Sequence, residues 1–266
     1  MTTATLTERI IARKEGAVGW LIFNNPERRN AVSVDMWEAI PEVLAQYEAD
    51  PQVRVIVLAG AGDKAFVSGA DISQFEKQRS GPEAVQRYEE LAEAAAAKLQ
   101  GCDKPVVGMI RGYCLGAGMN IAVLCDIRIA SDDARFGIPA AKMGLGYRAS
   151  SMKNLVEVVG AAYAREIMIT ARQFTAAEAK EMGLIGYVVP DGSALEKALE
   201  IAEVINKNGP LAVQAILRTI HETEGLHEND AFKIDTKIGI EVFISEDAKE
   251  GPLAFKEKRA PNFKMK

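Results

Sequence analysis

The sequence predicts an α/β fold that ends in an all-helical region. Short β-branched runs alternate with helical patterns along the first two-thirds of the chain. Two of these runs, "VRVIVL" and "VVGMI", are apolar at consecutive positions, which is typical of parallel strands buried on both faces. After Ala194 only helical patterns follow. Because strand–helix–strand order favours right-handed parallel units, we expect a core at 1–193 and a helical region at 194–266.

The elements of the core are expected from their apolar periodicity and from signals at their ends. Ser33 suits an N-cap, Pro82 suits the first turn of a second helix, and Gly101 suits the end of that helix. Strands are expected at 19–24, 53–60, 104–112 and 126–131, and helices at 33–50 and 82–100.

The C-terminal region divides into four expected helices. Gly209–Pro210 and Gly251–Pro252 separate successive helical patterns. The expected ranges are 194–208, 210–226, 228–246 and 248–259. Apolar residues are spread too thinly here for a core of much size. We therefore expect these helices to pack on the main domain or on another subunit.

Composition and charge narrow the possible partners. Of the 266 residues, 48% are hydrophobic and 26% are charged, as in ordinary globular proteins. The net charge of −5 disfavours nucleic acid and anionic membranes. No apolar run approaches the roughly 20 residues of a transmembrane helix. The N-terminal "MTTATLTERIIARKEG" lacks the apolar stretch and cleavage site of a signal peptide, so we expect a cytoplasmic protein.

Cysteine and histidine are scarce, which narrows the possible chemistry. Cys102, Cys114 and Cys125 have no metal-ligand spacing and suggest buried thiols in a reducing compartment. The two histidines, His221 and His227, lie in a charged segment, and we expect both to be solvated helix residues. No metal site is expected, and a Ser-His-Asp or Cys-His site would have to recruit one of these two.

Two similar glycine-rich turns are the most informative feature. "VSGADI" (67–72) follows one expected strand and "LGAGMN" (115–120) follows another. Glycine permits close backbone approach, and a helix start leaves N–H groups without partners. Gly112, Gly116 and Gly118 do not fit the G-x-G-x-x-G dinucleotide pattern. A purely structural turn remains open for either segment alone, and an acyl-group site that uses both is the other possibility.

Six segments, in order, resemble the enoyl-CoA hydratase/isomerase (crotonase) superfamily. The resemblance covers nearly the whole chain. The segments are "NNPERRNAVS" (24–33), "FVSGADI" (66–72), "GYCLGAGMNIAVLCDIRIAS" (112–131), "ARFGIP" (134–139), "TARQFTAAEAKEMGLIGYVVP" (170–190) and "EGPLAFKEKRAPNFK" (250–264). The resemblance implies that residues 1–193 form a ClpP-like spiral of ββα units that binds acyl-CoA. It also implies that 194–266 is an oligomerisation region that forms homotrimers, frequently paired into hexamers.

The resemblance also implies roles for individual residues. The backbone N–H groups of Ala70 and Ala117 would form an oxyanion hole for the enolate of a coenzyme A thioester. Coenzyme A would be part of the substrate, with no tightly bound cofactor. Phe255 and Lys258 would contact coenzyme A from the C-terminal helix, in this family often across a subunit boundary. The full set of implied coenzyme A contacts is Arg28, Ala31, Ser68, Asp71, Ile72, Ser73, Phe255 and Lys258.

The sequence departs from the hydratase pattern at both catalytic glutamates. Asn120 stands three residues after the second oxyanion donor, and Ala140 follows the proline of "ARFGIP". Hydration needs a group that deprotonates water and a proton donor for the α-carbon. An amide side chain can orient a molecule but cannot exchange protons near neutral pH, and a methyl group can do neither. Efficient hydration by the usual scheme is therefore disfavoured.

Without the two glutamates, the residues of the expected site fit a reaction with few proton transfers. Tyr147 aligns with a tyrosine of the methylmalonyl-CoA decarboxylases of this superfamily, and either a substrate-facing or a packed position is open for it. Arg148 is a candidate anion clamp. We expect lyase chemistry through a thioester enolate, hydratase-like or of the malonyl decarboxylase type, with Asn120 and Tyr147 at the reacting end. A catalytically impaired acyl-CoA binder is the alternative.

Overall fold

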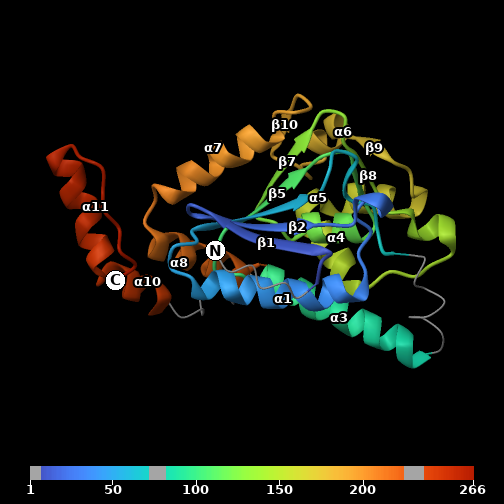
Figure 1. Ribbon diagram of the computed structural model, residues 1–266, viewed down its shortest axis with the longest axis horizontal. Coiled ribbons are helices and arrows are strands. Elements are labelled where there is room, and N and C mark those ends of the chain that lie inside the picture. The colour runs from blue at the N-terminus through green and yellow to red at the C-terminus, as the bar shows by residue number, and fades with distance from the viewer. Residues whose placement is uncertain (1–6, 72–81, 225–236) are drawn as a thin grey trace.

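Two sheets form the centre of the molecule. The structure, a computed structural model, describes residues 7–71, 82–224 and 237–266 (Figure 1). The first sheet has six strands in the order β1-β2-β3-β5-β7-β10: β1 (Ile10–Glu15), β2 (Val18–Phe23), β3 (Val55–Gly60), β5 (Val106–Ile110), β7 (Ile127–Ser131) and β10 (Tyr187–Val189). The second has four, in the order β4-β6-β8-β9: β4 (Ala65–Val67), β6 (Tyr113–Leu115), β8 (Arg135–Gly137) and β9 (Phe174–Thr175). Among the described strand pairs of these sheets, β1–β2 and β8–β9 are antiparallel and the others are parallel.

The chain repeats one unit, in which a strand of the first sheet is followed by a strand of the second sheet and then by a helix. β3 and β4 precede α3 (Pro82–Gln100), β5 and β6 precede α4 (Ala117–Val123), and β7 and β8 precede α5 (Ala149–Thr170). The remaining helices are η1 (Pro26–Arg28), α1 (Val34–Ala49), η3 (Pro139–Met143), α6 (Ala176–Glu181), α7 (Ala194–Asn206), α8 (Pro210–Thr223), α10 (Lys237–Phe243) and α11 (Glu246–Glu257). The short strands of the second sheet, the charged edge strand β1 and the helix α5 were not predicted. Strands of two or three residues are too short to show a period.

Helices cover both faces of the first sheet. α1 and α3 pack against each other on one side, and α7 lies along the other (Figure 1). Trp20, Val57 and Val107 point toward α7, where they pack with Ala198 and Ile201 in one buried cluster. α7 therefore completes the main core, although its residues fall within the predicted C-terminal helical region.

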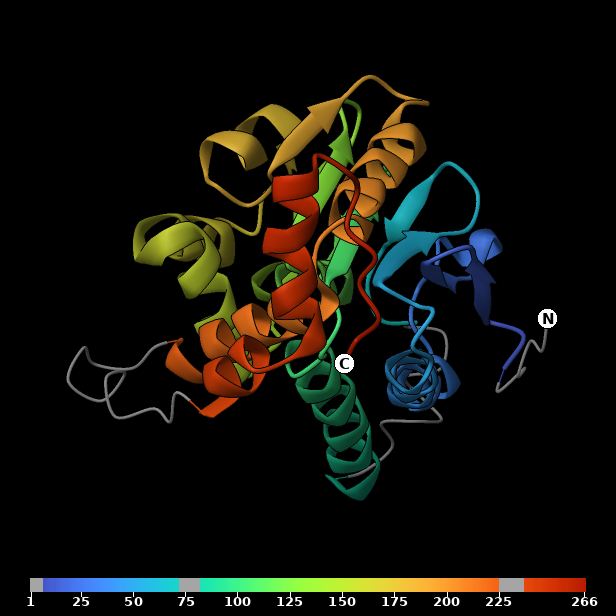
Figure 2. The same ribbon diagram turned by 90° about the vertical axis from the view of Figure 1, so that its left-hand side faces the viewer.

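The last two helices extend away from the body. α11 stands at the end of the molecule beyond α10, and the C-terminal tail runs back along it (Figures 1 and 2). The backbone N–H groups of Lys264 and Met265 donate to the carboxylate of Asp247 at 2.7 and 2.9 Å. No helix in the described ranges is long and apolar enough to cross a membrane.

Two ion pairs tie α8 to the core. Arg218 donates to both oxygens of Asp103, with Nε at 2.7 Å. His221 places Nε2 3.8 Å from Oδ1 of Asp126, and its side chain is only 23% exposed. His221 is therefore a helix residue, as predicted, but only partly solvated, because a partner on another element covers it. His227 lies outside the described residues.

Stability is expected to decrease as the pH rises through the pKa of His221. The nearby Asp126 carboxylate raises that pKa above its ordinary value of 6.5. A raised pKa in the folded state means that the stabilisation is fully present below the unfolded value and is lost above the folded one. Melting temperatures measured from about pH 6 to about pH 8 check this. His221→Gln should remove the part of the pH dependence that the pair contributes, and an unchanged profile would contradict the assignment.

Candidate active site

The first glycine turn follows β4 and exposes the N–H of Ala70. Val32 donates to the Gly69 carbonyl at 2.9 Å and accepts from the N–H of Asp71 at 2.9 Å. This makes a parallel bridge between Val32 and Ala70. Since neighbouring peptide groups of an extended chain point to opposite edges, the N–H of Ala70 points away from Val32.

The second turn follows β6 and begins α4. Gly116 has φ 52° and ψ −108°, a conformation that side chains disfavour, and Ala117 is the first residue of the helix. The N–H of Gly116 donates to the Gly137 carbonyl at 2.9 Å, which anchors the turn to β8. The N–H of Ala117 is one of the donors that a helix start leaves free.

The two turns are in direct contact. A Cβ built on Gly116 would lie 3.7 Å from the Cα of Gly69, and one on Gly118 would lie 2.2 Å from the carbonyl oxygen of Val67. Neither Ala70 nor Ala117 donates its N–H to any acceptor within the described parts of the chain. The fold therefore brings two unpartnered backbone donors to one place.

Gly118→Ala is expected to separate the turns. The added methyl group would overlap a backbone oxygen that cannot rotate away, so we expect the free energy of unfolding to fall by about 2 kcal/mol or more. Denaturant unfolding measures this. Gly239→Ala is the matched control, because that glycine also lies in a helix and nothing stands within 4 Å of its Cβ position. Equal stability of the two variants would contradict the close contact.

Asn120 and Tyr147 meet beside the second turn. The Tyr147 hydroxyl donates to Oδ1 of Asn120 and also lies 3.5 Å from the carbonyl oxygen of Gly116. Burial raises the pKa of Tyr147 well above its ordinary value, so the phenol stays protonated near neutral pH. The Nδ2 group of Asn120 has no acceptor among the residues whose placement is described.

Arg148 is held by α3 and is not an open anion clamp. Its Nε lies 3.3 Å from Glu89 and its Nη1 3.3 Å from Glu93. Ser150 also donates to Glu93, at 2.9 Å. These glutamates were not predicted, because nothing in the pattern of α3 distinguishes them from other charges on a solvated face. The cluster fixes the segment that carries Tyr147.

Ala140 lies in η3 and is 6% exposed. Asp71 is 3.6 Å from Nη1 of Arg28, and its side chain is 3% exposed. Glu83 is exposed on the first turn of α3. Asp71 is thus buried and paired with Arg28, and Glu83 faces solvent.

Several of the predicted coenzyme A contacts lie around the first turn. The Arg28 side chain is 54% exposed, whereas Ala31 is buried. Ser68 donates its hydroxyl to the Arg28 carbonyl at 3.3 Å. Together with the pair of Arg28 and Asp71, this bond ties the η1 segment to the first turn. Ile72 and Ser73 lie outside the described residues.

Phe255 and Lys258 are not brought to the two turns of their own chain. Phe255 lies in the last turn of α11 and Lys258 caps that helix, which stands at one end of the molecule, away from α4 (Figure 1). Phe255 is 85% exposed.

Asn30, which was not predicted as important, is fully buried and donates to the carbonyls of Ala61 and Ala65 at 2.9 and 2.8 Å. It holds the 24–33 loop against β4.

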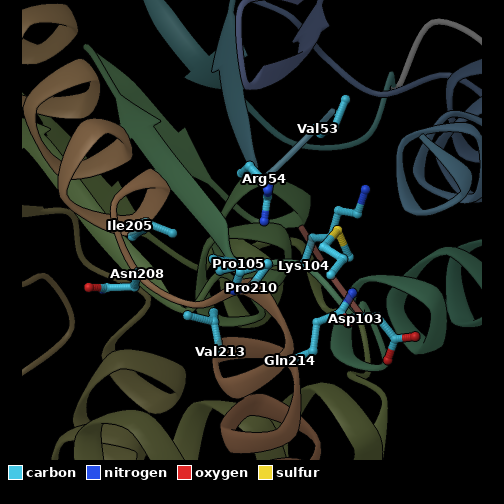
Figure 3. Close-up of a pocket in the computed structure, with 11 residues that line it drawn as sticks. Val53, Arg54, Asp103, Lys104, Pro105, Ile205, Asn208, Pro210, Val213 and Gln214 are labelled. Atoms are coloured by element: carbon cyan, nitrogen blue, oxygen red, sulfur yellow. The ribbon is translucent and has the colours of Figure 1, made fainter. Parts of the chain in front are cut away.

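A separate small pocket, open to solvent, contains none of the predicted site residues (Figure 3). Lys104 donates there to the carbonyls of Tyr47 and Asp50, and Asp103 is paired with Arg218. Its lining residues are Val53, Arg54, Asp103, Lys104, Pro105, Ile205, Asn208, Pro210, Val213, Gln214 and Met265. These come from the junction of the sheet with α8 and the C-terminal tail, so the pocket is distinct from the two turns.

Comparison with known proteins agrees with the fold. The enoyl-CoA hydratase/isomerase family matches residues 13–266. The chain is 44% identical to enoyl-CoA hydratase EchA19 of Mycobacterium tuberculosis. The alignment spans 264 residues and covers 99% of each protein. It is 34% identical to the short-chain-enoyl-CoA hydratase of Clostridium acetobutylicum, over 94% of this chain and 95% of that one. A solved enoyl-CoA hydratase from Bacillus anthracis superposes with a TM-score of 0.93 at 30% identity, over 97% of this chain and 100% of that one. The predicted crotonase fold is thus confirmed, and the chain belongs to the enoyl-CoA hydratase/isomerase family.

Proposed function

We propose that this chain is an acyl-CoA-processing enzyme that holds a thioester enolate between the N–H groups of Ala70 and Ala117. The observation that carries the proposal is the pair of unpartnered donors, within the described chain, on two turns in contact. An enolate places negative charge on the thioester oxygen. Preorganised donors stabilise that charge more than they stabilise the ground state, which is what accelerates a reaction. Coenzyme A is then part of the substrate.

Decarboxylation of a malonyl-type thioester fits the side chains at the reacting end. The bond between the carboxylate and the α-carbon breaks, and its electron pair forms the enolate as CO₂ leaves. A proton from water then completes the acyl product. No carboxylate base is required, which agrees with an amide at Asn120 and a methyl group at Ala140.

Hydration of an enoyl-CoA is the second candidate. The support for hydration is that two similar relatives are named enoyl-CoA hydratases. It requires a group that activates water and a proton donor for the α-carbon, each contributing roughly 10²–10⁴-fold. Asn120 and Ala140 supply neither, so any hydration is expected to be slow unless another group acts in their place.

A panel of thioesters tests the proposal. The purified protein is offered crotonyl-CoA, longer enoyl-CoAs and malonyl-type thioesters. We expect turnover of a malonyl-type thioester and slow hydration of crotonyl-CoA. Fast hydration that survives Asn120→Ala would contradict the importance of the missing glutamates. Binding of thioesters without any turnover would identify a non-catalytic acyl-CoA binder.

We also propose a homotrimer, or a dimer of trimers, assembled through the C-terminal helices. Large apolar side chains of α8, α10 and α11 are exposed in the single chain, among them Ile216, Ile220, Ile240, Phe243 and Phe255. In such an assembly Phe255 and Lys258 would reach the coenzyme A of a neighbouring subunit. Three buried cysteines without disulfides support a cytoplasmic location.

A further inference from the structure

The amide of Asn120 is oriented by a partner inside the protein. Asn120 lies one turn after Ala117, so both are on the same face of α4. Helical side chains lean toward the N-terminus of their helix, which here is the end that carries the Ala117 N–H. The Tyr147 hydroxyl donates a hydrogen bond to Oδ1 of Asn120. The two N–H donors on Nδ2 are therefore the part of the amide left over for a ligand.

We propose that Tyr147 fixes Asn120 with Nδ2 toward the acyl group, so that the site selects thioesters that carry an acceptor oxygen on the third carbon. A ketone or a carboxylate at that carbon would accept from Nδ2 while the thioester oxygen accepts from Ala70 and Ala117. The inference rests on the proposed function, because it takes the oxyanion pair as the position of the thioester oxygen. Beyond the proposed function, it specifies which acyl groups the site prefers, namely those with an acceptor oxygen on the third carbon.

The distances along the helix suit this arrangement. Asn120 is about 4.5 Å further along the axis of α4 than Ala117, and its side chain leans back over that distance. One short acyl group can therefore contact both residues. A glutamate at this position would present oxygens only and would repel a carboxylate, whereas an amide nitrogen donates to it.

Tyr147 acts through Asn120 and is a positioning residue. Its single hydroxyl proton has two acceptors inside the protein, Oδ1 of Asn120 and, at 3.5 Å, the carbonyl of Gly116. The ion pairs of Arg148 with Glu89 and Glu93 hold the adjoining backbone. With the phenol engaged in this way, the Asn120 amide is a free side-chain donor beside the two backbone donors, as far as the described residues show.

The test compares affinities for two ligands of equal chain length. Acetoacetyl-CoA carries a ketone on its third carbon and butyryl-CoA does not. Titration calorimetry of the wild type should show acetoacetyl-CoA binding about tenfold more tightly, the value of one good hydrogen bond. Asn120→Leu, which keeps the size but removes the donor, should bring the ratio close to one. Tyr147→Phe should reduce the ratio, and the double variant should match Asn120→Leu, because the tyrosine acts only through the amide.

Tyr163→Phe, a change at another tyrosine, is the control and should leave the ratio unchanged. Equal wild-type affinity for the two ligands would overturn the inference and leave the proposed function standing. A preference that survives Asn120→Leu, as ionisation of acetoacetyl-CoA to its enolate would produce, would also overturn it. Full retention of the ratio in Tyr147→Phe would remove the positioning role. If a correctly folded wild type binds neither thioester, the proposed function fails and the inference falls with it.

Discussion

Ala117→Pro is expected to lower kcat/KM for the thioester substrate by about 10²–10³-fold, the usual effect of losing one oxyanion donor. Proline has no N–H, so the substitution removes the donor that the proposal assigns to Ala117. The helix itself should tolerate the change. Ala117 is the first residue of α4, where proline is favoured and where the missing N–H breaks no helical hydrogen bond.

The matched control for this prediction is Ala117→Gly. Glycine keeps the N–H and removes only a methyl group, so kcat/KM should stay close to the wild-type value. Melting temperatures of both variants show whether α4 has kept its fold. A folded Ala117→Pro variant with wild-type kcat/KM would exclude Ala117 as an oxyanion donor.

Asn120→Glu is expected to raise the rate of crotonyl-CoA hydration by about 10²-fold, the lower end of a general acid–base contribution. The substitution restores a carboxylate one turn from the oxyanion pair. Tyr147 can still donate to it, because an ionised carboxylate accepts hydrogen bonds as the amide oxygen does. Adding Ala140→Glu tests the second missing carboxylate, although Ala140 is only 6% exposed and its surroundings must rearrange to admit a longer side chain.

Asn120→Gln separates charge from size in this experiment. Glutamine has the length of glutamate but cannot exchange protons near neutral pH, so its hydration rate should remain at the wild-type level. The rates are measured by the loss of the enoyl absorbance at saturating substrate. If the Asn120→Glu variant binds crotonyl-CoA and hydrates it no faster than Asn120→Gln, the absent glutamate is not what limits hydration.

Much of the fold and part of the site could be predicted because their signals are local. Apolar runs located the central strands, and Ser33 and Pro82 marked helix starts at the positions observed. The glycines of both turns indicated close backbone approach before any contact was known. The short strands of the second sheet escaped prediction, because three residues such as Ala65–Val67 hold no period and are defined only by their partners.

The sequence by itself determined the repeating strand and helix order, the two glycine turns, and the absence of glutamate at 120 and 140. Only the tertiary structure decided where the remaining side chains act. Tyr147 meets Asn120 across 27 positions of sequence, and Arg148 meets Glu93 across 55. Whether Tyr147 faces a substrate or orients an amide depends on how α3, α4 and η3 pack. Contacts between elements so far apart in the chain are set by that packing, and no local pattern of residues records them.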